Sequence, residues 1–160
     1  METKDWILLI VPIILDSLIF YFIHLYFENK LKIKNEYQQK QRKLERKIYK
    51  YCNSSISDLD NLIETFDNKE FKEIGLQIAK VVENVETMKK LIIDNIELKD
   101  FISYLNIIIW ELNLAEKEIC KLASNQTEEA RQESMKLLNA ELYILMRSMD
   151  EMRKLCMQQN

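Results

Sequence analysis

Hydrophobic and polar residues divide the chain into one continuous apolar run followed by segments with helical periodicity. The run is WILLIVPIILDSLIFYFIHLYF, residues 6–27. Beyond it, apolar residues recur every three or four positions, which is the spacing of one helix face. The chain contains one Gly and one Pro, whereas strand-rich folds need turn residues at short intervals. The pattern therefore predicts an all-α protein.

The periodic segments predict four helices after the apolar run. The first continues through the charged stretch 28–50 to about Phe66, because that stretch contains no helix breaker. The apolar stripes of the others cover residues 71–88, 98–119 and 135–152. The connections between them are short, and short connections favour antiparallel neighbours. The predicted fold is one N-terminal transmembrane helix followed by a cytoplasmic up-down bundle of about four helices.

Two stretches predict where helices begin. FDNKEF separates the first two bundle helices, and Asp67 or Asn68 can cap the second. LASNQTEEA is the clearest boundary, because Asn125 or Thr127 can cap and two glutamates follow in the first turn.

The apolar run is long enough to cross a membrane. Twenty-two helical residues rise about 33 Å. Fifteen of them are Leu, Ile, Val or Phe, and they favour insertion by roughly 5–7 kcal/mol. Asp16 at the centre costs about 2.5–3.5 kcal/mol, so the apolar contribution is larger. A cleaved signal peptide is rejected, because the chain starts METKD and no small-residue cleavage site follows the run.

Charge gives the predicted orientation and domain plan. Residues 28–50 contain nine Lys/Arg against three Glu, whereas residues 51–160 contain thirteen Lys/Arg against twenty Asp/Glu. One Lys precedes the run, so the positive-inside rule places the C-terminal domain in the cytoplasm and the N-terminus outside. The plan is an external tail (1–5), a transmembrane helix (6–27), a basic juxtamembrane helix (28–50) and a cytoplasmic bundle (51–160).

The basic residues of the juxtamembrane helix are predicted to meet anionic lipid headgroups, at about 1 kcal/mol each near the surface. Because the nearby membrane already explains this charge, nucleic acid is not expected as a partner. The residues concerned are Lys30, Lys32, Lys34, Lys40, Arg42, Lys43, Arg46 and Lys47.

Polar residues of the apolar run gather on one helix face. At 100° per residue, the polar side chains from residue 16 to residue 24 fall within an arc of about 140°. The opposite arc is uniformly apolar and suits lipid. Polar groups on one face should point at protein or water, and another copy of the chain is the simplest shield. The predicted pore-facing or oligomer-interface residues are Asp16, Ser17, Phe20, Tyr21, His24 and Glu28.

Three interpretations of this stripe stay open. Asp16 and Ser17 can join helices through hydrogen bonds, either within a homo-oligomer or with the helix of a partner. Alternatively, several copies can close around a polar lumen and make a pore. In the third interpretation Asp16 is simply protonated or tolerated.

Catalytic signatures are missing from the sequence. The single Gly, Gly75, cannot form a phosphate-binding loop, and the only His lies in the apolar run. Cys52, Cys120 and Cys156 are widely spaced, so they predict buried small hydrophobic residues rather than a metal site. We therefore predict a protein without enzymatic activity and without a cofactor.

The layout resembles the small membrane accessory proteins of type VI-B CRISPR systems, which have one N-terminal membrane helix and a bundle related to HEPN domains. The resemblance rests on the run 6–27 with Asp16 inside, the basic segment and the bundle after it. It implies a ring-shaped membrane pore, here of about six or more copies, that strengthens anti-phage defence beside an RNA-targeting nuclease. HEPN ribonucleases place a His four to six residues after an Arg, and Arg131, Arg147 and Arg153 have no such His. RNA cleavage by that motif is therefore excluded.

The sequence thus favours a homo-oligomeric inner-membrane pore-forming effector that permeabilises or depolarises the membrane. Its expected partners are the lipid bilayer, other copies of itself and an RNA-guided nuclease or another cytoplasmic signal. The alternative is a non-conducting membrane-anchored adaptor whose bundle docks a cytoplasmic partner. A membrane-tethered RNA binder is a third option, and it would need the basic segment to be free of lipid.

Overall fold

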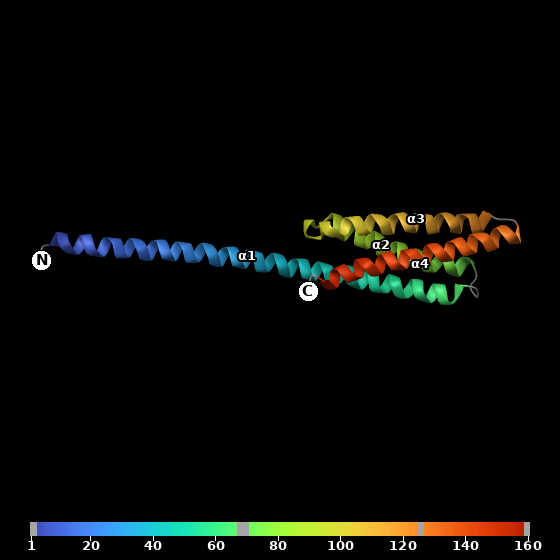
Figure 1. Ribbon diagram of the computed structural model, residues 1–160, viewed down its shortest axis with the longest axis horizontal. Coiled ribbons are helices and arrows are strands. Elements are labelled where there is room, and N and C mark those ends of the chain that lie inside the picture. Colours follow the sequence, from blue (N-terminus) through green and yellow to red (C-terminus); the bar gives the residue numbers. More distant parts are fainter. Residues whose placement is uncertain (1–2, 67–70, 125–126, 159–160) are drawn as a thin grey trace. The chain divides into compact units, whose positions relative to one another are not determined.

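The computed structural model describes the backbone of residues 3–66, 71–124 and 127–158, and the side chains of residues 17–66, 73–124 and 127–158. Figure 1 shows its helices in chain order. They are α1 (Thr3–Glu64), α2 (Phe71–Ile93), the 3₁₀ helix η2 (Ile96–Phe101), α3 (Ile102–Ser124) and α4 (Glu128–Gln158). The described residues contain no strand, so the all-α prediction is confirmed.

The chain divides into two compact units, Met1–Lys40 and Gln41–Asn160. The second unit is an up-down bundle made of the C-terminal part of α1 together with α2, α3 and α4, with consecutive helices running in opposite directions (Figure 1). The predicted bundle of about four helices is therefore confirmed. The predicted basic juxtamembrane helix, 28–50, contributes residues to both units.

The bundle core follows from apolar residues spaced three or four positions apart, which place one stripe of each helix inward. In α1 the buried stripe runs from Leu44 to Leu62, with Phe66 just beyond the helix, and in α2 it runs from Ile74 to Ile92. The buried apolar stripe of α3 runs from Leu105 to Leu122, and that of α4 runs from Leu138 to Cys156. Each stripe lies on a single helix face, so the pattern that predicted the helices also explains their packing.

Two side-chain hydrogen bonds link α1 to its neighbours in the bundle. Asn84 of α2 donates a hydrogen bond to Ser55 of α1 over 3.1 Å, and Ser55 is fully buried. Arg153 of α4 donates to the Asn53 side chain of α1 over 3.0 Å. A buried polar group such as the Ser55 hydroxyl is costly without a partner, so the bond from Asn84 favours one register of α1 against α2. The bond from Arg153 is exposed and adds a weaker link to α4.

Helix boundaries match the sequence in some places and differ in others. The basic stretch is helical as predicted, because α1 runs through it without a break. Thr127 caps α4, since its Oγ1 accepts the Ala130 backbone N–H over 3.4 Å. Asn125, the other candidate cap of α4, lies outside the described residues, as do Asp67 and Asn68, the candidate caps of α2.

The segment before α3 differs from the sequence prediction. Residues 98–101 were assigned to the third helix, whereas they lie in the 3₁₀ helix η2. Leu98 and Phe101 are both buried, and side chains three residues apart share one face in a 3₁₀ helix.

The prediction that all three cysteines are buried was partly wrong. Cys52 and Cys156 are buried, but Cys120 is exposed, because it lies on the α3 face opposite the bundle core.

Among the residues that the structure describes, no helix is both long enough and apolar enough to cross a membrane. Residues 6–16 of the predicted span, including Asp16, lie outside the residues whose side chains the structure describes. The transmembrane helix therefore stays a prediction.

Candidate functional site

The described part of α1 before the bundle exposes large apolar side chains on all sides. Every described side chain from residue 17 to residue 40 is exposed. Phe20, the most exposed of the large apolar residues in this stretch, is 76% accessible. The other large apolar and aromatic side chains exposed here are Leu18, Ile19, Tyr21, Phe22, Ile23, Leu25, Tyr26, Phe27, Leu31, Ile33 and Tyr37. Contiguous apolar surface of this kind marks a membrane or protein contact.

The predicted polar stripe is partly visible in this segment. His24 and Glu28 lie one helical turn apart, with 3.6 Å between His24 Nδ1 and Glu28 Oε2. Both side chains are largely exposed, as are Ser17, Phe20 and Tyr21. The structure thus brings His24 and Glu28 together, whereas Asp16 lies outside the described side chains.

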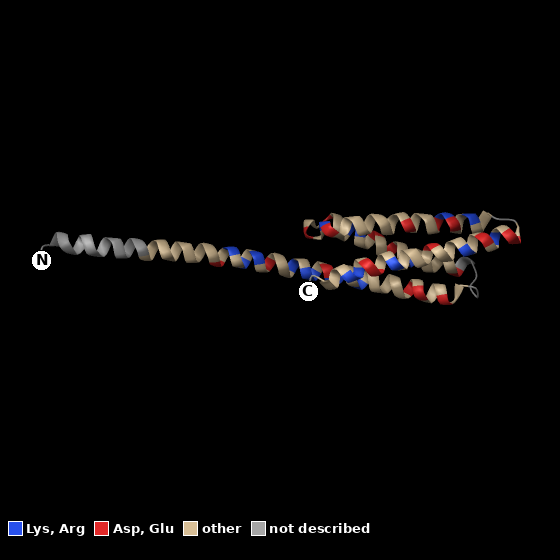
Figure 2. Cartoon of the chain, viewed as in Figure 1, with Lys and Arg blue, Asp and Glu red and all other residues tan. Residues whose placement is uncertain are grey.

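The basic segment follows the apolar stretch directly. All eight basic residues predicted to face the membrane surface, from Lys30 to Lys47, are exposed. In Figure 2 the described part of α1 is uncharged at first, and Lys and Arg then recur along it. An exposed helix with this order of residues presents an apolar zone and a cationic zone side by side, which is the arrangement that suits the boundary between acyl chains and anionic headgroups.

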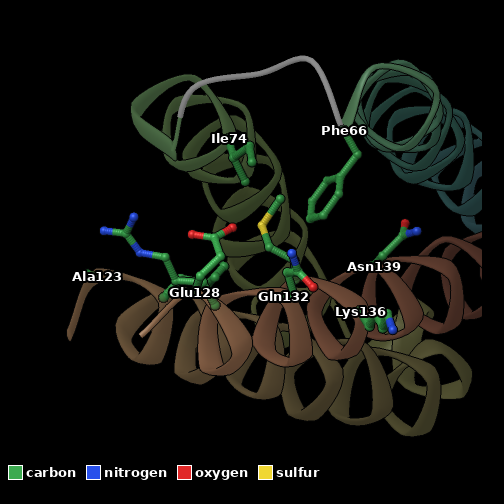
Figure 3. Close-up of a pocket in the computed structure, with 10 residues that line it drawn as sticks. Phe66, Ile74, Ala123, Glu128, Gln132, Lys136 and Asn139 are labelled. Carbon is green, nitrogen blue, oxygen red and sulfur yellow. The ribbon is translucent and has the colours of Figure 1, made fainter. Parts of the chain in front are cut away.

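A cavity of about 680 Å³ lies in the bundle near the start of α4, and the sequence did not predict it. Its wall is apolar where Phe66, Ile74 and Leu122 line it. Figure 3 shows Phe66 and Ile74 projecting toward α4. The sequence signal that could have located the cavity is in α4. Glu128 and Arg131 occupy the same helix face as Met135, so the core stripe of α4 starts with charged residues.

The bundle also contains carboxylates at positions where apolar residues would be expected. Glu45, Glu111 and Glu118 are buried, and one carboxylate oxygen of each has no hydrogen-bond partner. Burial raises the pKa of the Glu111 carboxyl above its usual range, and a hydrogen bond with Glu141 and the like charge of Glu141 raise it further. No group of His, Cys, Asp or Glu among the described residues is arranged to hold a metal ion.

Comparison with protein-family models, with curated proteins and with solved structures found no match to this chain. The case for a function therefore rests on the sequence, on the exposed segment of α1 and on the bundle.

Proposed function

We propose that the protein is a membrane-anchored homo-oligomer whose N-terminal helices surround a polar path across the bacterial inner membrane. The observation that supports it most is the apolar segment of α1, whose large apolar side chains from residue 18 to residue 27 are all exposed. Water is a poor environment for a helix segment that exposes so many large apolar side chains, whereas lipid and other copies of the chain are suitable ones.

The order of zones along α1 supports the orientation in this proposal. The apolar run 6–27 comes first, and exposed Lys and Arg side chains follow it from residue 30 onward. The positive-inside rule then assigns the bundle to the cytoplasm. At about 1 kcal/mol for each basic residue near the headgroups, the basic segment adds several kcal/mol to membrane binding.

The polar stripe favours a pore over a plain anchor. A single membrane helix has no second helix of its own to shield Asp16, Ser17 and His24, so several copies with their stripes turned inward give these groups a common polar interior. The bundle would receive a cytoplasmic signal. The resemblance in layout to the type VI-B accessory proteins suggests that this signal comes from an RNA-targeting nuclease during phage infection.

Dye leakage from vesicles tests the pore. Full-length protein reconstituted in vesicles should release a small trapped dye. The Asp16→Leu variant should insert equally well, because it removes a cost of about 2.5–3.5 kcal/mol, but it should release much less dye. Leu18→Ala, on the opposite arc, is the matched control and should leak like the unchanged protein. Unchanged assembly and leakage in Asp16→Leu would show that the polar-lumen idea is wrong.

The non-conducting adaptor is kept as a second candidate because the bundle itself exposes large apolar side chains, among them Trp110 and Ile107 on α3. Such residues can dock a partner. Replacing residues 6–27 by a plain poly-leucine membrane helix separates the two candidates. If cells that carry the nuclease and the poly-leucine variant reduce phage plating as much as cells with the unchanged protein, the adaptor is supported. If protection is lost while the variant still reaches the membrane, the pore is supported.

A further inference from the structure

The cavity near the start of α4 changes in character from its floor to its rim. Its floor is made of three buried apolar side chains, those of Phe66, Ile74 and Leu122. Its rim includes Arg131 and Lys136 of α4, both of which are exposed. The cavity therefore offers an apolar surface that is largely withdrawn from water and a charged surface at its opening.

The size of the cavity suits a small molecule. Its volume of about 680 Å³ lies within the range of about 300–1,000 Å³ that is usual for small-molecule sites, which combine apolar walls with a few polar groups. Close-packed protein interiors leave few gaps larger than a water molecule, so a space of this size is unusual in a bundle core. In Figure 3 the Glu128 side chain extends from α4 toward the side of the space where Ile74 lies.

The charges at the rim favour an anion. Arg131 and Lys136 are cationic and Glu128 is anionic, so these lining residues carry a net charge of +1. Among the residues that the structure describes, neither Arg131 nor Lys136 has an ion-pair partner. The positive end of the α4 dipole also lies at this opening, because the helix begins at Glu128.

Asn139 adds a polar group to the cavity. It lines the cavity, and its Oδ1 is buried without a hydrogen-bond partner among the described residues. Buried polar atoms normally have a partner, and an amide can donate as well as accept. The Asn139 amide is therefore a hydrogen-bonding group that a ligand can engage.

We propose that the cavity binds a small amphiphilic anion. Its apolar chain lies against Phe66, Ile74 and Leu122, and its carboxylate or phosphate group lies at the rim beside Arg131 and Lys136. Burial of the chain contributes the larger part of the binding free energy, since the transfer of each CH₂ group out of water is favourable. The rim cations select the sign of the head group, because exposed ion pairs add little affinity whereas like charges disfavour binding.

This inference goes beyond the proposed pore, and its test does not depend on the pore. The cavity lies at the end of the bundle where α1 finishes, because Phe66 lines it. Gln41, where the bundle unit begins, lies about 38 Å back along α1. In the proposed membrane orientation, a probe dissolved in the bilayer would label residues 17–27 and not the cavity.

Photolabelling of the full-length protein in lipid nanodiscs tests the site. The probe is dodecanoate with a diazirine at the end of its chain, and mass spectrometry of the digested protein locates the label. Label is expected on the peptides that contain Ile74 or Leu122, and excess unlabelled dodecanoate or dodecyl phosphate should suppress it roughly tenfold. The stronger competitor identifies the head group. Label that is confined to residues 17–27, or that excess competitor leaves unchanged, would overturn the proposal.

Charge variants test the rim. Arg131→Gln combined with Lys136→Gln removes both cations and should lower the labelling of the cavity roughly three- to tenfold. Arg147→Gln combined with Lys117→Gln is the matched control, because both residues are exposed and lie outside the lining. It changes the net charge equally and should label like the unchanged protein. A dodecyl trimethylammonium probe with the same diazirine should label the cavity weakly, and equal labelling by the two probes would overturn the proposal.

A blocking variant leaves every charge in place. Ala123 lines the cavity and is exposed, so Ala123→Trp fills part of the space without forcing bulk into the core. It should abolish the label that competitor suppresses. Ser124→Trp, at the next position and outside the lining, should retain that label, and equal labelling of the two variants would contradict the site. A protein that labels in the cavity but releases no dye would reject the pore and keep this site, whereas dye release without cavity label would do the reverse.

Discussion

Replacing Glu111 by Gln should stabilise the bundle at neutral and alkaline pH and have little effect in acid. Glu111 is 6% exposed on α3, and one oxygen each of Glu111 and Glu141 is buried without a hydrogen-bond partner. Because burial and Glu141 raise the pKa of Glu111 above its ordinary value of 4.5, the folded state binds this proton more tightly than the unfolded state does.

The sign of the pH dependence follows from linkage. A carboxyl whose pKa is raised by folding contributes most favourably below its unfolded pKa, and that contribution is lost as the pH rises through the folded value. Leaving a buried polar group charged or unpaired costs about 1–3 kcal/mol. A Gln at this position stays neutral at every pH and can donate its amide to Glu141. The expected gain is therefore about 1–3 kcal/mol at pH 8 and close to zero at pH 4.

Thermal unfolding followed by circular dichroism at both pH values measures this gain. For a bundle of this size, 1 kcal/mol corresponds to about 3–5 °C in Tm. Glu116→Gln, exposed on the same helix, is the control and should change Tm little at either pH. A Glu111→Gln variant that melts lower than the unchanged protein at pH 8, or that gains equally at pH 4 and pH 8, would refute the reasoning.

Three further predictions concern the bundle. Ile108 is completely buried, so Ile108→Ala should lower the free energy of unfolding by about 2–5 kcal/mol, measured by chemical denaturation. Thr127→Ala removes the N-cap of α4 and should cost about 1 kcal/mol in the same assay, while Thr127→Ser should restore most of it. Cys120 should react with a thiol reagent in the native protein, whereas Cys52 and Cys156 should react only on unfolding, because burial raises both pKa values to about 12. Rapid labelling of all three thiols in mass spectra of the native protein would contradict the packing of α1 against α4.

Local periodicity explains why the helical fold could be predicted. The spacing of three and four between residues such as Ile74, Ile78 and Val81 specifies one buried face without knowledge of its neighbour. Thr127 could be predicted because a cap depends only on the next three residues. The 3₁₀ helix η2 was missed because Leu98 and Phe101 suit either helix type until their burial against the bundle selects one.

For the candidate site, the sequence predicts which residues of one helix share a face, but it does not predict which residues of different helices meet. The sequence places Asp16, Ser17 and His24 on one helix face, since helical geometry relates residues that are close along the chain. It does not reveal the proximity of Glu111 to Glu141, because that depends on how α3 and α4 pack over thirty residues of separation. The cavity beside α4 escaped notice for the same reason, as Phe66 and residues of α2, α3 and α4 all contribute to its lining.

The mass of the full-length protein in mild detergent, measured by light scattering with the detergent contribution subtracted, tests the central claim of self-assembly most directly. The account predicts a single species that contains several copies, about six or more if the assembly is a closed ring. A monomer that persists across detergents would contradict it, because Asp16 and the exposed apolar face of α1 would then have no shield from another copy.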